Sequence, residues 1–166
     1  MWGKQPLLLI LKPASRSKSM ENPKYLYVSA ASLTMYEFVS EGPKGRILKL
    51  VKYTEYGNTG IYNLGFGDKL GDSNRFDDKI ISGNGDSEKI LATVASTVYE
   101  FTAEYPDAFI IAEGSTSART RLYRMGISNA LEEINNDFNV FGFLDKKWRK
   151  FEPNQNYSAF AITKKQ

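Results

Sequence analysis

Four short β-rich segments follow one another in the first half of the chain, and they constrain the fold more than any other feature of the sequence. They are rich in Tyr, Phe, Val, Ile and Leu, they are separated by turn residues, and they cover residues 25–28, 35–39, 47–53 and 61–66. Short strands with intervening turns are typical of an antiparallel meander. Between the second and third segments, Gly42-Pro43-Lys44-Gly45 favours a short turn that pairs the two strands.

The fourth segment has two different faces. Tyr62, Leu64 and Phe66 alternate along one face, whereas Gly65 and Gly67 lie on the other. Glycine inside a strand often marks a place where another backbone approaches closely. We therefore expect a helix or a backbone segment to lie against the glycine face.

A helix is predicted from Ser87 to about Glu104, after a turn at Asn84-Gly85-Asp86. Its apolar residues recur at helical spacing: Ile90, Leu91, Val94, Val98 and Phe101. The other elements expected downstream are a buried strand at 108–112, shorter helices at about 117–125 and 129–137, a hairpin of 140–143 with 148–151, and a last strand at 157–163. These elements predict an α+β fold, a largely antiparallel sheet packed against a central helix at about 87–104.

We expect one domain over residues 20–166 and a disordered leader or upstream extension over residues 1–19. The apolar run at 7–11 is too short for a signal peptide or a membrane span. The leader contains four bases and no acid, and the whole chain has 22 bases against 19 acids. The body is therefore close to neutral, and its overall charge gives little support to nucleic-acid binding. We expect a cytoplasmic protein without membrane contact.

The chain contains neither cysteine nor histidine. This excludes thiol nucleophiles, histidine-dependent triads and zinc or iron–sulfur sites that need these ligands. The polar stretch from Asp68 to Asn84, with a possible short strand at 79–82, has four aspartates that could bind a hard cation. Their spacing does not fit an EF-hand loop and bases lie between them, so we expect a solvated loop, no metal site and no cofactor.

A run of hydroxyls and arginines follows the buried strand: Gly114-Ser115-Thr116-Ser117-Ala118-Arg119-Thr120-Arg121-Leu122-Tyr123-Arg124. A turn at a helix start presents unpaired backbone N–H groups that can bind an anion, and arginine strengthens such a site. The candidate anion-binding residues are Ser115, Thr116, Ser117, Arg119, Arg121 and Arg124. At 100° per residue the three arginines do not all converge. The buried stripe of this helix is expected to be Ala118, Leu122 and Met125.

The alternative interpretation is structural: the arginines pair with Glu113, Glu132 or Glu133, and the hydroxyls only cap the helix. Glu113, at the carboxyl end of the buried strand, is a weak candidate for a catalytic carboxylate. Tyr123 and Trp148 are candidates for stacking on a base, Trp148 because it lies among four bases at 146–150. The competing role for Tyr123 is packing in the core. The competing role for Trp148 is an inward-facing ring on a hairpin at the sheet edge, which the charged residues keep soluble.

Several segments together resemble a functionally uncharacterised family of small bacterial proteins. They are the EF-x-SEGPKG segment at 37–45, NLGFGD at 63–68, residues 85–94, GST-x-x-RTRLYR at 114–124 and residues 140–142. The resemblance covers about residues 36–162 and implies a bacterial, single-domain protein. It implies no activity and no catalytic residue.

Three functions stay open from the sequence. The first is binding of a phosphate-bearing ligand, RNA or a nucleotide, at the Gly114 to Arg124 segment. The second is a non-catalytic module, one half of an operon-encoded pair, whose arginines face an acidic protein partner. The third is a histidine-free hydrolase or nuclease that uses Glu113 and arginine.

Overall fold

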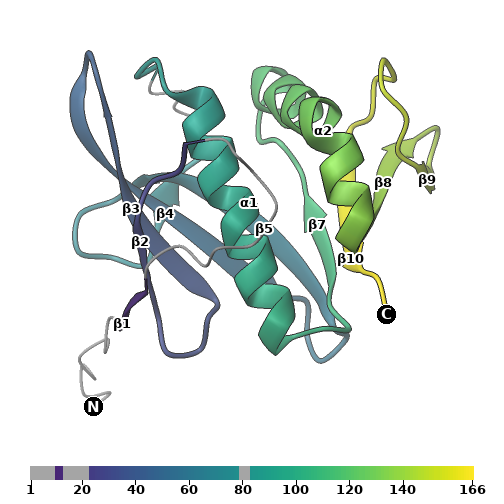
Figure 1. The fold of residues 1–166 in the computed structure, drawn as a ribbon, viewed down its shortest axis with the longest axis horizontal. Helices are drawn as coiled ribbons and strands as arrows, with labels where there is room; N and C mark the ends of the chain where they lie inside the picture. The colour runs from purple at the N-terminus through teal and green to yellow at the C-terminus, as the bar shows by residue number, and fades with distance from the viewer. Residues whose placement is uncertain (1–9, 13–22, 79–82) are drawn as a thin grey trace.

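The sheet is built from both halves of the chain (Figure 1). The structure, a computed structural model, describes residues 10–12, 23–78 and 83–166. Its strands are β1 (Ile10–Lys12), β2 (Tyr27–Ser29), β3 (Met35–Gly42), β4 (Gly45–Glu55), β5 (Ile61–Lys69), β6 (Phe76–Asp77), β7 (Phe109–Ala112), β8 (Phe138–Leu144), β9 (Lys147–Lys150) and β10 (Ala159–Lys164). Nine strands pair in the order β1-β2-β3-β4-β5-β7-β10-β8-β9, and β6 pairs with β5 beside this path. Among the described strands only β5 and β7 pair in parallel, so the predicted α+β class with a largely antiparallel sheet is confirmed.

Strands β2 to β5 form the predicted meander. Gly42 pairs with Gly45, so the turn between β3 and β4 has two residues, and the φ of Gly45 is +90°. Glycine adopts this conformation without steric cost. Tyr36, Val51 and Tyr53 lie at most 3% exposed on these strands and form the centre of the core.

The glycine face of β5 is covered by a backbone, as predicted. A Cβ atom on Gly67 would lie 2.2 Å from the carbonyl oxygen of Asp77, and one on Gly65 would lie 2.7 Å from the ring of Phe76. Both contacts are with residues of β6, and both are too close to allow a side chain at Gly65 or Gly67. Glycine at these positions therefore allows β6 to lie on the sheet.

The first helix, α1, spans Ser87–Glu104 as predicted, and its apolar stripe faces the sheet. Phe101 is fully buried and stacks on the ring of Tyr53 with 4.0 Å between centroids. Two threonines on the same face are also fully buried, Thr93 and Thr97. Thr93 Oγ1 accepts a hydrogen bond from the backbone N–H of Tyr25 at 2.9 Å, and the hydroxyls of Thr97 and Tyr53 are hydrogen-bonded at 2.9 Å. The helix is thus joined to the meander by polar as well as apolar contacts.

The second helix, α2, is continuous over Ser117–Asp137, so the prediction of two shorter helices at about 117–125 and 129–137 is wrong. Glycine inside a helix costs about 1 kcal/mol relative to alanine, which a long packed helix tolerates. A Cβ atom on Gly126 would lie 2.8 Å from Cδ1 of Leu91 on α1. Gly126 therefore permits a close approach of the two helices and does not end α2.

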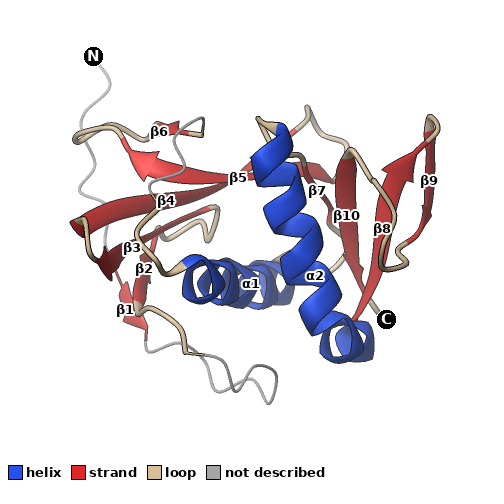
Figure 2. Cartoon of the chain, turned by 90° about the horizontal axis from the view of Figure 1, so that it is seen from above, coloured by secondary structure: helices blue, strands red, loops and turns tan. Residues whose placement is uncertain are grey.

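Both helices lie on one side of the sheet, which curves around them (Figure 2). The predicted hairpin is formed by β8 and β9, and the last strand, β10, lies between β7 and β8. Within the described residues, no helix combines the length and the hydrophobicity needed to cross a membrane.

Of the predicted leader, the structure describes only β1, which pairs antiparallel with β2. The remainder of residues 1–19 lies outside the described residues, as does the possible short strand at 79–82. The prediction of a disordered leader and a single domain over residues 20–166 therefore stays a prediction.

Candidate functional site

The turn between β7 and α2 is fixed by local hydrogen bonds. Thr116 is the N-cap, and its hydroxyl accepts a hydrogen bond from the backbone N–H of Arg119 at 3.2 Å. The hydroxyl of Ser115 donates to the carbonyl oxygen of Asp78. A Cβ atom on Gly114 would lie 2.4 Å from the backbone nitrogen of Thr120, so only glycine fits there. Two of the three predicted hydroxyls thus hold the turn, and Ser117 is exposed.

The three arginines diverge, as the helical geometry predicted. Arg119 points into the molecule and is only 5% exposed. Arg121 is exposed, and Arg124 donates to the side chain of Asn156 in the loop before β10. The six residues predicted to bind an anion are therefore not brought together around one point. The prediction of an anion at this helix start itself stays untested.

The buried face of α2 differs from the expected stripe. Arg119 and Tyr123 are its buried residues, whereas Ala118 is exposed and Met125 is 50% exposed. Nη1 of Arg119 donates to the carbonyl oxygen of Phe66 at 2.7 Å, and the guanidinium lies 5.3 Å from the centroid of the Phe66 ring. The carbonyl accepts a hydrogen bond from the guanidinium, and the aromatic ring packs against it. These two contacts allow Arg119 to be buried, although the periodicity of the apolar residues predicts that it faces solvent.

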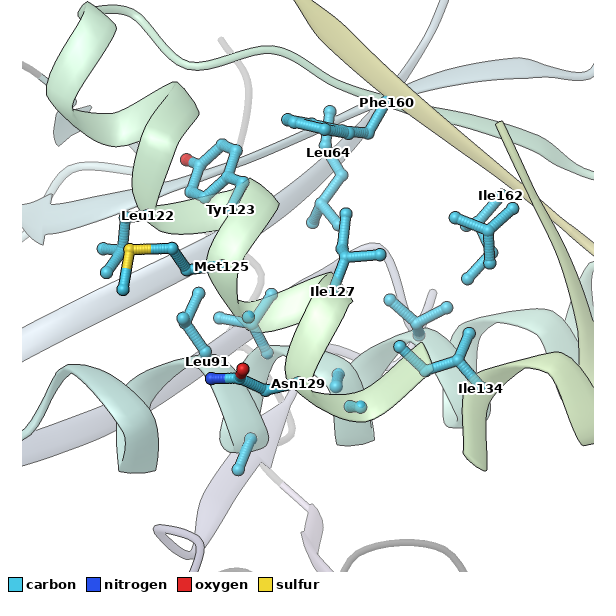
Figure 3. A pocket seen from close by; sticks show the side chains of 18 of the residues that line it. Leu64, Leu91, Leu122, Tyr123, Met125, Ile127, Asn129, Ile134, Phe160 and Ile162 are labelled. Atoms are coloured by element: carbon cyan, nitrogen blue, oxygen red, sulfur yellow. The ribbon is translucent and has the colours of Figure 1, made fainter. Parts of the chain in front are cut away.

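An apolar cavity of about 450 Å³ lies between α1, α2 and the sheet (Figure 3). Its walls are mostly aliphatic and come from both helices and from β5, β7, β8 and β10: Leu64, Leu91, Val94, Val98, Ile110, Leu122, Ile127, Ile134, Val140, Phe160 and Ile162 are among its lining residues. Tyr123 contributes the only phenol of the lining, and Met125 and Asn129 are exposed residues at its border. We call this space the interhelical cavity.

A smaller space of about 40 Å³ adjoins it, which we call the polar annex. The annex and the interhelical cavity share four lining residues: Phe66, Ser87, Leu122 and Tyr123. The annex is also lined by the cations Lys49 and Arg119, which are 3% and 5% exposed, and by Asp86. A largely apolar space is thus adjoined by a charged one.

Lys49 and Asp86 each have partners within the protein. The ammonium of Lys49 forms a salt bridge with Asp68 on the neighbouring strand β5. The carboxylate of Asp86 accepts hydrogen bonds from Tyr25 at 2.7 Å and from Ser40 at 2.5 Å. Ser87, the first residue of α1, lines both spaces, and with Asp86 and Ile90 it places the N-terminal, positive end of the helix beside the polar annex.

Tyr123 lines both spaces. Its ring packs against Phe66 with 5.5 Å between centroids. Burial raises the pKa of its hydroxyl, an effect that the neighbouring Arg119 opposes. Tyr123 is therefore a neutral phenol at ordinary pH, and the prediction that it stacks on a base stays a prediction.

The remaining predicted site residues lie elsewhere. Glu113 is exposed just beyond the end of β7, and among the described residues it does not line either space. Trp148 is on β9, on the sheet face opposite the helices. In the described part of the chain no group of three or more acidic side chains is placed to hold a metal ion. Among the aspartates of the 68–78 segment, Asp68 forms the salt bridge with Lys49.

A family model described as a family of unknown function, DUF6934, matches residues 21–165. The chain belongs to this family. The DUF6934 match confirms the resemblance drawn from the sequence segments. No curated protein and no solved structure matches the chain.

Sequence reasoning did not predict the interhelical cavity or the role of Lys49. The cavity depends on α2 lying across α1, a contact between residues far apart in the sequence, and the burial of Lys49 depends on its salt bridge with Asp68 on β5. Two signals were present: Lys49 interrupts the apolar run at 47–51, and Gly126 interrupts a helical pattern.

Proposed function

We propose that this DUF6934 protein binds a small amphipathic anion. The apolar body of the ligand occupies the interhelical cavity, and its carboxylate or phosphate points towards Lys49 and Arg119 in the polar annex. The observation that carries the proposal is that the two spaces adjoin and share four lining residues: Phe66, Ser87, Leu122 and Tyr123.

The size and the lining of the cavity support a small molecule. Ligand sites in proteins are concave spaces of about 300–1,000 Å³ with mostly apolar walls and a few polar groups that orient the ligand. The interhelical cavity, at about 450 Å³, falls within this range. Its exposed border at Met125 and Asn129 gives the ligand a way in.

The buried cations support an anionic group. Burying a cation has a large desolvation cost, even when it has a partner. Lys49 and Arg119 are both retained at the end of an apolar cavity, beside the first residue of α1. An anion there gains from both charges and from the helix dipole in a poorly hydrated site.

The proposal keeps the phosphate-bearing ligand expected from the sequence but places it on the inner side of α2. Arg119 faces the ligand, and Thr116 and Ser115 support the turn that positions Arg119. Arg121 and Arg124 lie on the outer side of the helix and do not line the two spaces as the structure describes them.

The experiment compares three probes that share one apolar chain: decanoate, decyl phosphate and decanol. Isothermal titration calorimetry is expected to show saturable binding of the two anions and weaker binding of the alcohol. In the Lys49→Met variant the anions lose about 1.5–3 kcal/mol, the size of a charge-assisted hydrogen bond, whereas decanol binds as before.

A blocking variant separates the cavity from the surface. Ala95 lines the interhelical cavity, and Ala95→Phe is expected to abolish binding of all three probes. Ala103 is an exposed residue of the same helix, and Ala103→Phe is the matched control that leaves binding unchanged. Equal loss in both variants, or equal affinity for decanol and decanoate, would contradict the proposal.

A further inference from the structure

Four aromatic side chains gather on the sheet face opposite the helices. They are Phe109 on β7, Phe141 and Phe143 on β8, and Trp148 on β9. The ring centroids of Trp148 lie 5.0 Å from Phe143 and 5.9 Å from Phe109, and Phe109 lies 6.4 Å from Phe141. We call these four residues the aromatic patch.

The strand register places the patch on the outer face. Side chains alternate between the two faces of a strand. Val140 lines the interhelical cavity, so its neighbour Phe141 and, two residues later, Phe143 point away from it. Trp148 pairs directly with Phe143, and Lys150 pairs with Phe141, so both share this outer face.

The patch is accessible to solvent. Trp148 is 38% exposed, and the three phenylalanines are half-buried. Both α1 and α2 lie on the other side of the sheet (Figure 2). Large aromatic surfaces left in water are unusual and commonly mark a binding surface.

The hairpin that carries Trp148 is strongly basic. Residues 146–150 contain Lys146, Lys147, Arg149 and Lys150 and no acid. All four residues of β9 are exposed. The neighbouring Asp145 lies 3.6 Å from Arg149, which leaves the three lysines as the excess charge of the hairpin.

We propose that this face binds single-stranded nucleic acid. Unpaired bases stack on Trp148 and Phe143, and the phosphates lie along Lys150, which shares their face, and Lys146 in the β8–β9 turn. Proteins that bind single strands without sequence preference combine these two elements, aromatic platforms and a basic track. The cores of protein–protein interfaces are instead depleted in lysine, so the charge favours a polyanion over a second protein.

The proposal is independent of the interhelical cavity, because the two sites lie on opposite faces of the sheet. The Ala95→Phe variant, which fills the cavity, is expected to bind oligonucleotides as the wild type does. Failure of one proposal therefore leaves the other standing.

The test uses the full chain and fluorescein-labelled oligouridylate and oligothymidylate of about ten nucleotides, a typical site size for a single-strand binding module. Fluorescence anisotropy at fixed salt measures the affinity, and a duplex of the same length is the comparison. We expect saturable binding that is tighter for single strands than for the duplex and that weakens as salt is raised. Each variant keeps the basic leader, so the contribution of the leader to oligonucleotide affinity is the same in all of them.

The variants separate stacking from charge. Trp148→Ala is expected to weaken single-strand binding about 5- to 150-fold, the range that stacking on one aromatic ring contributes per base. Lys146→Glu combined with Lys150→Glu is expected to reduce both the affinity and its salt dependence. The matched controls are Tyr56→Ala, an aromatic residue 53% exposed outside the patch, and Lys44→Glu in the β3–β4 turn, both without effect.

Three results would overturn the proposal. The first is the absence of saturable binding by the wild type, and the second is equal affinity for single strands and duplex. The third is a dimer in sedimentation experiments that Trp148→Ala dissociates while oligonucleotides do not bind. That outcome would assign the aromatic patch to a second copy of the chain.

Discussion

Replacement of Asp68 by asparagine tests how strongly the charges near the polar annex are coupled. The Lys49 side chain is 4% exposed and that of Asp68 is 20% exposed, and the two form a salt bridge between β4 and β5. Removing one member of a buried ion pair costs about 3–5 kcal/mol, because the other charge stays desolvated. Asp68 is partly reached by water, so we expect Asp68→Asn to lower the free energy of unfolding by about 3 kcal/mol.

The reverse change is expected to be milder. Lys49→Met replaces the buried ammonium with an apolar side chain and leaves the carboxylate of Asp68 in partial contact with water, at a cost of about 1–2 kcal/mol. The double variant is expected to lose no more than Lys49→Met alone, which gives a coupling energy of at least about 3 kcal/mol.

Urea unfolding of the wild type, both single variants and the double variant measures this coupling, with a constant slope as the check that the unfolded state is unchanged. The control pair is Arg46 and Glu41, which lie 3.4 Å apart with side chains 75% and 61% exposed. Glu41→Gln is expected to cost less than about 0.5 kcal/mol. Additive effects of the Lys49 and Asp68 substitutions would refute the reasoning.

Three further predictions concern stability. Thr116→Ala removes the N-cap of α2 and is expected to cost about 1 kcal/mol by urea unfolding, whereas Thr116→Ser costs little. Gly142→Ala places a Cβ atom 2.3 Å from the ring of Tyr157 and is expected to cost about 1–3 kcal/mol by the same assay. Burial raises the pKa of Tyr36 and Tyr53 above the ordinary value, so the stability that they contribute is complete below about pH 10 and is lost as pH rises further. Tyrosinate absorbance is therefore expected to show a group of tyrosines that ionise only together with loss of the circular dichroism signal, and non-cooperative ionisation of all ten tyrosines in folded protein would contradict this.

The local pattern of the sequence was sufficient to predict most elements of the fold. The meander, α1 and the β8–β9 hairpin follow from periodicity and turn residues, which act over a few residues. The prediction of two shorter helices in place of α2 was wrong: Gly126 lies inside one continuous helix, where it permits the close contact with Leu91. The parallel pairing of β5 with β7 joins segments separated by α1, and no local signal encodes it.

The candidate site was less accessible to sequence reasoning. The Gly114 turn and the divergence of the arginines follow from helical geometry, and both are observed. The burial of Arg119 depends on the carbonyl of Phe66, a residue 53 positions earlier in the chain. Periodicity assigns charged residues to solvent and cannot anticipate such a partner. Lys49 was likewise hidden in an apolar strand until Asp68 was placed beside it.

Methyl NMR of the protein titrated with decanoate tests the proposed amphipathic-anion site most directly. Methyl groups inside the interhelical cavity belong, among others, to Leu91, Val94, Val98, Leu122 and Ile127. We expect saturable shifts of these methyls, with no shifts for Leu48 and Leu70, which are 40% and 42% exposed and lie outside the cavity. Shifts confined to surface methyls, or no saturable shifts at all, would contradict the proposed function.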